Sequence, residues 1–270
     1  MLNKKEKTAY TLTIIVALLF ASWWLFNFIW ASPGDKSLEL YSDTYWVTAL
    51  VGSVIGFIAA KQWGGWKSIF GKSLCFFSLG MLAQVAGQLT YSYFAIVKGV
   101  ETPYPSVGDI GFFGSIIFYI LGIIFLSKAI GAHFNKASKG QKVIAVLIPL
   151  LILVGSYAIF LRSYEFSGDP LVTFLDFGYP LGQALYLSLA LLAYILSFRL
   201  LGGTMKNKIL LLLFALAVQY SADFNYLYRV NHEQWYAGDI NDFQYQTAYL
   251  LMTLALLSIG AVVTKLRAKN

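Results

Sequence analysis

The chain has 270 residues, of which 58% are hydrophobic, 17% aromatic and only 12% charged. Crossing the roughly 30 Å hydrocarbon core of a bilayer takes about 20 apolar residues in an α-helix. Eight such segments fill most of the chain, which excludes a soluble domain of any size and predicts one all-α, eight-span membrane domain over residues 1–270. The predicted spans are residues 8–30, 44–61, 73–97, 107–128, 143–162, 171–198, 209–228 and 243–264.

The formal net charge is +7, but the placement of the charges argues against a nucleic-acid partner. If the basic tail before the first span is cytoplasmic and the spans alternate, sixteen of the 20 Lys and Arg residues fall on the inner side. Twelve of the 13 Asp and Glu residues then fall on the outer side. Because Lys and Arg concentrate in cytoplasmic loops, we predict a multi-pass plasma-membrane protein with both termini in the cytoplasm and the lipid bilayer as its surroundings.

The first hairpin begins with Lys4, Lys5 and Lys7 and ends in a turn that carries Trp63 and Trp66. Its first apolar run is longer than the 7–15 residues of a typical secretory signal, so we predict that it is retained as a span. Tryptophan beside lysine at the end of a span is typical of an anchor at headgroup depth.

The second hairpin carries Gln84, Gln88 and Tyr91 at a spacing that places them on one helix face. Amides in hydrocarbon need partners, so this face should look into the bundle or at a wet cavity. Bonds between helices are the alternative to ligand contacts for these glutamines. A proline-rich turn containing Tyr104 then delivers Asp109 to the start of the fourth span.

The third and fourth hairpins each hold an acidic residue beside a special feature. Pro180 cannot donate a hydrogen bond to the carbonyl of Asp176 and is expected to kink the helix there. Asp223 lies inside the seventh span, where an ionisable group is costly and by default suggests a functional site. Alternatively, Arg229 or the glutamines of the third span neutralise or bind Asp223.

The sequence also predicts four copies of one helical hairpin. In each copy an Asp is followed three residues later by an aromatic residue, and successive Asp residues are 66, 67 and 66 positions apart. The pairs are Asp43 with Trp46, Asp109 with Phe112, Asp176 with Tyr179, and Asp242 with Tyr245. Such Asp residues either cap helix N-termini or, for the last three, converge on an outward-facing pocket for a cation or polar ligand.

The residues that many enzymes and cofactor proteins require are missing from the sequence. The two histidines, His133 and His232, fall in predicted loops, so no pair can hold a haem inside the bundle. Cys75 is alone, and no span carries a lysine near its middle. No nucleotide-binding, hydrolase or redox motif is present. We therefore expect no enzyme activity, no metal and no cofactor.

Three stretches resemble the multi-span N-terminal membrane regions of bacterial diguanylate cyclases and related signalling proteins. They are Pro103-Tyr-Pro-Ser-Val-Gly-Asp-Ile-Gly-Phe, Leu175-Asp-Phe-Gly-Tyr-Pro-Leu-Gly182, and Ser221-Ala-Asp-Phe-Asn-Tyr226 with the later Trp235-Tyr-Ala-Gly-Asp-Ile-Asn-Asp242. The resemblance covers roughly residues 80–265 and matches Asp109, Asp176, Tyr179 with Pro180, Asp223 and Asp242 to the family motifs. It implies a membrane sensory module. Because the family continues into an output domain and this chain ends at Asn270, a signal is expected to pass to a separate partner.

The leading hypothesis is a stand-alone membrane sensor that binds an unknown small ligand at its outer face and signals through a cytoplasmic or membrane partner. Its predicted ligand-binding residues are Asp109, Asp176, Asp223, Asp242, Gln84 and Gln88, with Tyr91, Tyr104 and Tyr179 lining the pocket. A transporter or channel for a small polar or cationic solute is the second hypothesis, and a structural subunit of a membrane complex is the third.

Overall fold

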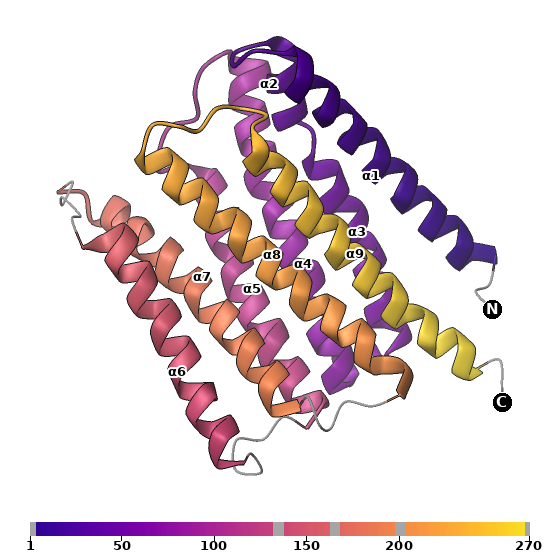
Figure 1. The fold of residues 1–270 in the computed structure, drawn as a ribbon. Helices are drawn as coiled ribbons and strands as arrows, with labels where there is room; N and C mark the ends of the chain where they lie inside the picture. Colours follow the sequence, from indigo (N-terminus) through magenta and orange to yellow (C-terminus); the bar gives the residue numbers. More distant parts are fainter. Residues whose placement is uncertain (1–3, 132–137, 163–167, 198–202, 268–270) are drawn as a thin grey trace.

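The computed structural model describes residues 4–131, 138–162, 168–197 and 203–267, and every regular element in these ranges is helical (Figure 1). Eight helices in these ranges are long and apolar enough to cross a membrane, as the sequence predicts. The α-helices are α1 (Lys4–Trp30), α2 (Lys36–Ser42), α3 (Trp46–Gln62), α4 (Ile69–Ser92), α5 (Val107–Ala129), α6 (Lys139–Ser156), α7 (Pro170–Ser197), α8 (Lys206–Asn231) and α9 (Ile240–Arg267).

Short irregular helices extend or join these spans. The 3-10 turns η1 (Gly65–Lys67) and η5 (Gly203–Met205) precede α4 and α8, and the π-helical turns η2 (Tyr93–Lys98) and η4 (Tyr157–Leu161) extend α4 and α6. The second span differs from its prediction, because the seven-residue α2 precedes α3 and the two together form the membrane-length segment.

Six of the helices form a closed ring of neighbours, in the order α3, α4, α5, α7, α8, α9 and back to α3. The two other long helices lie outside this ring. Helix α1 packs mainly against α9, with contacts to α2 and α3, and α6 packs against α7 (Figure 1). Polar and aromatic side chains that point into the ring are therefore shielded from lipid by a full circle of helices.

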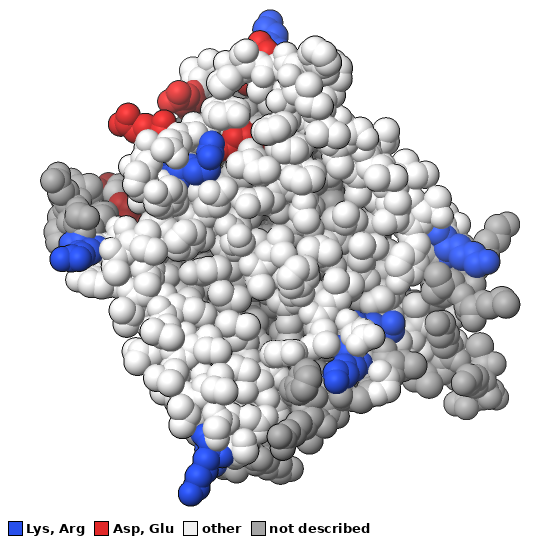
Figure 2. All heavy atoms as spheres, in the orientation of Figure 1, with Lys and Arg blue, Asp and Glu red and all other residues white. Residues whose placement is uncertain are grey.

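The described acidic side chains gather toward one end of the bundle. We call this the acidic end, and it carries α2 and the α4–α5 and α8–α9 connections, whereas the start of α1 and the end of α9 lie at the opposite, basic end (Figure 1). Figure 2 shows the visible Asp and Glu atoms at the acidic end and several Lys or Arg side chains at the other. The alternation of the spans agrees with the sequence; which end faces the cytoplasm and whether the hairpins are repeats stay predictions.

Glycines allow a close crossing of α4 and α5. A Cβ placed on Gly111 would lie 2.5 Å from the backbone nitrogen of Gly87 and 2.6 Å from the carbonyl oxygen of Ala83. In α4 of the same helix pair, a Cβ on Gly80 would lie 2.3 Å from the ring of Tyr119 in α5. Small residues at such crossings let two membrane helices approach closely, since packing rather than water exclusion drives their association.

We expect Gly111→Ala to destabilise the protein by roughly 1–3 kcal/mol, because the added methyl group meets backbone atoms that cannot rotate away. Gly114→Ala is the matched control in the same helix, since a Cβ there has no neighbour within 4 Å. Thermal unfolding of both variants in detergent measures the effect. Equal melting temperatures for the two variants would contradict the close crossing.

Candidate functional site

Asp109 caps the start of α5 and also reaches across to α7. Its Oδ2 accepts a hydrogen bond from the backbone N–H of Ser106 at 2.7 Å, which completes a capping box at the helix N-terminus. Its Oδ1 accepts a hydrogen bond from the Tyr179 hydroxyl, also at 2.7 Å. Asp109 is 5% exposed, so the capping bonds and the tyrosine replace most of the water that a carboxylate would otherwise bind.

A second tyrosine–aspartate pair joins the start of α5 to α7, with the aspartate now on α7 and the tyrosine before α5. The hydroxyl of Tyr104, in the connection before α5, donates a hydrogen bond to Asp176 Oδ1 in α7 at 2.6 Å. Partial burial, and then the hydrogen bond to Asp176, raise the pKa of the Tyr104 phenol well above its usual value, so the proton stays on the donor. Because Tyr104 is 46% exposed, this pair is the one nearest to solvent.

Asp223 lies deeper, inside the ring of six helices, and accepts hydrogen bonds from three neutral donors. The hydroxyl of Tyr186 (α7) lies 2.7 Å from Oδ2, and the hydroxyl of Tyr245 (α9) lies 3.0 Å from Oδ1. Gln219, one turn earlier in α8, donates to Oδ1 at 3.2 Å. Asp223 is 5% exposed. It therefore ties α7 and α9 to α8 through hydrogen bonds without an ion pair.

The sequence-based alternative, in which Arg229 or the glutamines of the third span bind Asp223, is wrong. Arg229 forms its ion pair with Asp239, at 2.8 Å between Nε and Oδ2, and Gln84 and Gln88 bind elsewhere. Burial raises the pKa of the Asp239 carboxyl, while a backbone N–H and the Arg229 guanidinium oppose this effect. Glutamine does bind Asp223, but it comes from the same helix rather than from α4.

The glutamines of α4 meet hydroxyl groups inside the ring. Gln84 donates to Ser115 Oγ at 2.8 Å, and its side-chain oxygen accepts a hydrogen bond from the Tyr249 hydroxyl at 3.2 Å. Gln88 donates to the hydroxyl of Tyr45. The rings of Tyr45 and Tyr249 stack with centroids 6.2 Å apart. Bonding between helices, rather than an open face, accounts for both amides in this structure.

The four repeated Asp residues have different local roles. Asp242 lies in the first turn of α9 and accepts the backbone N–H of Gly238 at 2.8 Å, so capping describes it as well as Asp109. Asp43 follows α2, and its backbone carbonyl accepts the Trp46 indole N–H at 2.7 Å. Asp176 lies in the second turn of α7, past the N-terminus, so capping does not describe it.

The predicted site residues therefore fall into two groups. One group, at the acidic end, contains Asp109 and Asp176 with Tyr104 and Tyr179. Tyr91 contacts the ring of Phe112 edge-on at 5.5 Å. The other group lies inside the ring around Asp223 and Gln84. Asp242, at the start of α9, lies near both groups: Tyr45 and Tyr249 of the inner group are its electrostatic neighbours, and it shares Tyr226 as a neighbour with Asp109.

The sequence-based site left out the four tyrosines that complete the inner group, although Tyr245 was named as the aromatic residue that follows Asp242. They are Tyr45, Tyr186, Tyr245 and Tyr249, all at most 1% exposed or, for Tyr245, partly buried and packed on the core. A phenol placed well inside an apolar span is the signal that could have found them, because a buried tyrosine hydroxyl needs a hydrogen-bond partner.

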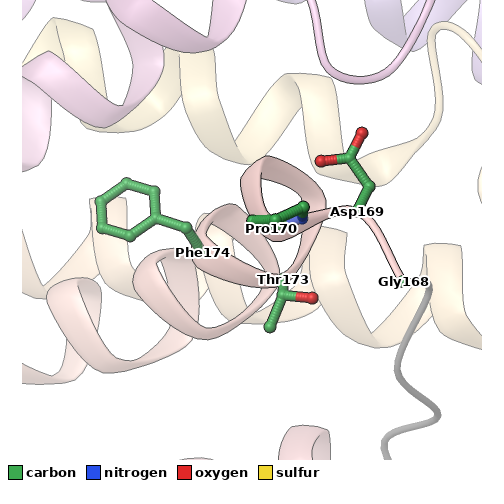
Figure 3. Close-up of a pocket in the computed structure, with 5 residues that line it drawn as sticks. All are labelled: Gly168, Asp169, Pro170, Thr173 and Phe174. Atoms are coloured by element: carbon green, nitrogen blue, oxygen red, sulfur yellow. The ribbon is translucent and has the colours of Figure 1, made fainter.

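An open surface hollow of about 460 Å³ lies at the start of α7 (Figure 3). It is lined by Gly168, Asp169, Pro170, Thr173 and Phe174, none of which is a predicted site residue. The Asp169 carboxylate accepts the backbone N–H of Leu171 at 2.7 Å, so it caps α7. Within the described residues, no three His, Cys, Asp or Glu side chains lie together as metal ligands.

Comparison of the chain with protein-family models, with curated proteins and with solved structures finds no match. The resemblance to the membrane regions of diguanylate cyclases thus stays a prediction from short motifs. What the arrangement can do chemically must be argued from its own contacts. Most of the polar groups named above satisfy one another, so a ligand would have to replace hydrogen bonds that the protein already makes.

We expect Tyr186→Phe to lower the stability of the folded protein by roughly 1–3 kcal/mol, because it removes one of the three donors to a buried carboxylate. Tyr157→Phe, at a site 53% exposed, is the matched control and should have little effect. Thermal unfolding of the two variants in the same detergent provides the measurement. A Tyr186 variant as stable as the control would mean that Asp223 does not depend on this hydroxyl.

Proposed function

We propose that this protein is an integral membrane sensor, in which a small polar or cationic ligand binds at the acidic end and changes the position of α7. One observation carries the proposal: three tyrosine–aspartate hydrogen bonds join α7 to its neighbours. Tyr104 binds Asp176, Tyr179 binds Asp109, and Tyr186 binds Asp223.

The three α7 residues in these pairs form a line along the helix. Positions 176, 179 and 186 fall within about 80° of one another around a helix of 3.6 residues per turn. They span about 15 Å along the axis at 1.5 Å per residue, roughly half of the hydrocarbon core. The line thus connects the solvent-exposed pair at the acidic end with the buried pair in the interior.

Helix α7 also differs from the other members of the ring in how its two ring neighbours contact it. Its contacts with α5 and α8 are sparser than those at the α4–α5, α3–α4 and α8–α9 boundaries. Pro180 lies within it and cannot donate a backbone hydrogen bond to Asp176, although Gly178 and Gly182 let α7 approach Phe113 and Ile116 of α5 closely. Because α7 has fewer contacts with α5 and α8, hydrogen bonds contribute a larger share of the interaction between these helices. Breaking one hydrogen bond therefore has a greater effect on the position of α7.

The chemistry of the exposed pair suggests the class of ligand. Asp176 offers a carboxylate that accepts a hydrogen bond from Tyr104, and Asp109 and Tyr91 are further neighbours of the Tyr104 phenol. An ammonium group or another strong donor would compete with the phenol for Asp176, and an aromatic ring beside a carboxylate favours organic cations. Release of Tyr104 would break a hydrogen bond at the α5–α7 boundary and allow α7 to move. The movement would extend to the end of α7 at the basic end, where a partner protein would bind and respond to it.

We expect at least one compound in a panel of amino acids, polyamines and quaternary ammonium compounds to raise the melting temperature of the purified protein. Tyr104→Phe combined with Asp176→Asn should abolish the increase, because it removes the proposed ligand contacts. Tyr157→Phe is the control, since it changes an exposed phenol on η4. No stabilising compound, or an equal increase in all three proteins, would argue against a ligand site at this position.

The proposed direction of signalling requires the acidic end to face outward. In a Cys75→Ala background, a membrane-impermeant maleimide should label Glu101→Cys on intact cells and should not label Lys67→Cys, since both sites are exposed but lie at opposite ends. Labelling of Lys67→Cys alone would reverse the orientation, and labelling of both would contradict the eight crossings.

Transport is the second candidate, and the burial of Asp223 inside the ring favours it. Carboxylates in membrane interiors often mark ion or proton pathways. Solute flux in vesicles containing the purified protein separates the two functions: a sensor binds the compound without moving it, whereas a transporter carries it across and loses this activity in Asp223→Asn.

A further inference from the structure

Two lysines at the basic end converge on one aromatic ring. The Nζ of Lys72 lies 5.8 Å from the centroid of the Phe125 ring, and the Nζ of Lys128 lies 5.5 Å from the same centroid. Lys72 belongs to the first turn of α4 and Lys128 to the last turn of α5. The two ammonium groups therefore lie within about 11 Å of each other, on neighbouring antiparallel helices.

No protein carboxylate balances this pair in the described structure. The ion pair that the described residues form, between Arg229 and Asp239, lies at the acidic end. Lys72 is also placed where the dipole of α4 is positive, which raises the local potential further. The two lysine ammonium groups near one ring therefore form a local positive charge that attracts an anion.

The surface next to the lysines is a strip of stacked aromatic rings. Phe125 stacks on Phe76 with centroids 5.4 Å apart and an interplanar angle of 11°, and Phe76 contacts Phe118 at 6.4 Å. Trp66, 53% exposed, packs edge-on against Phe76 at 5.2 Å. Phe118 and Phe125 lie two helical turns apart, so the strip runs about 10 Å along α5 toward the middle of the membrane.

We propose that Lys72 and Lys128 bind the phosphate of an anionic phospholipid, and that the strip formed by Phe76, Phe118 and Phe125 contacts its acyl chain. Basic side chains at a membrane surface attract anionic headgroups, and tryptophan at the same depth anchors the interface. The aromatic strip favours a lipid over a free phosphate ion, because only the lipid has an acyl chain that can contact the apolar rings beside the lysines. This site is at the opposite end from the proposed ligand site and does not depend on it.

Native mass spectrometry of the purified protein, titrated with phosphatidylglycerol or phosphatidylcholine, tests the proposal. Wild-type protein should retain phosphatidylglycerol and not phosphatidylcholine. Lys72→Gln with Lys128→Gln should weaken retention by about 25-fold, at roughly fivefold for each lysine near an anionic headgroup. The control, Lys61→Gln with Lys208→Gln, removes the same charge from the same end and should retain the lipid.

A second arm separates the lipid from its headgroup. Phe118→Ala should weaken retention of phosphatidylglycerol, and millimolar glycerol phosphate or inorganic phosphate should not displace the lipid. Should the double lysine variant fail to fold, each single variant should show a loss of about fivefold. Equal losses in the lysine pair and its control would indicate general attraction to the basic end and overturn the site. Displacement of the lipid by free phosphate would also overturn it.

Discussion

The arrangement of this protein depends on the cost of placing carboxylates and amides in hydrocarbon. Such groups are expensive to bury unless donors and acceptors of the protein replace water. Here the donors are mainly phenols: Tyr179 serves Asp109, and Tyr186 with Tyr245 serves Asp223. Tyrosine suits this task, because its ring packs like an apolar side chain while its hydroxyl reaches across to another helix. Each such bond also fixes which helices are neighbours.

The boundaries between helices differ in which atoms meet there. Glycines bring α4 and α5 into backbone contact at Gly87 and Gly111, whereas Gly52 and Gly56 of α3 make room for the side chains of Thr253 and Leu256 of α9. Helix α7 has fewer contacts with the ring and carries α6 on its outer side. Helix α7 therefore joins the other ring helices through a line of hydroxyl–carboxylate contacts in addition to its share of the apolar core, which includes Leu187 and Ala190.

The number of spans and their alternation could be predicted from the sequence, because length and hydropathy alone decide them. The partners of the polar residues could not, since they depend on which helices become neighbours. The spacing of three residues suggested that Tyr179 belongs with Asp176 and Tyr245 with Asp242. In the structure each hydroxyl binds a different aspartate, Asp109 and Asp223, on an adjacent helix. Equal spacing along the chain thus did not produce equal contacts.

The docking of α1 has a consequence for synthesis. The indole of Trp24 stacks on Phe243 with centroids 4.3 Å apart, and its N–H donates to the carbonyls of Gly238 and Asp239. Trp24 and Gly238 are 214 residues apart in the sequence, so α1 is synthesised well before the start of α9. During insertion α1 must therefore wait, with the indole of Trp24 lacking these partners, until translation delivers Gly238 and Asp239. The docking of α1 on α9 is thus a late event in assembly that the insertion of α1 itself cannot complete.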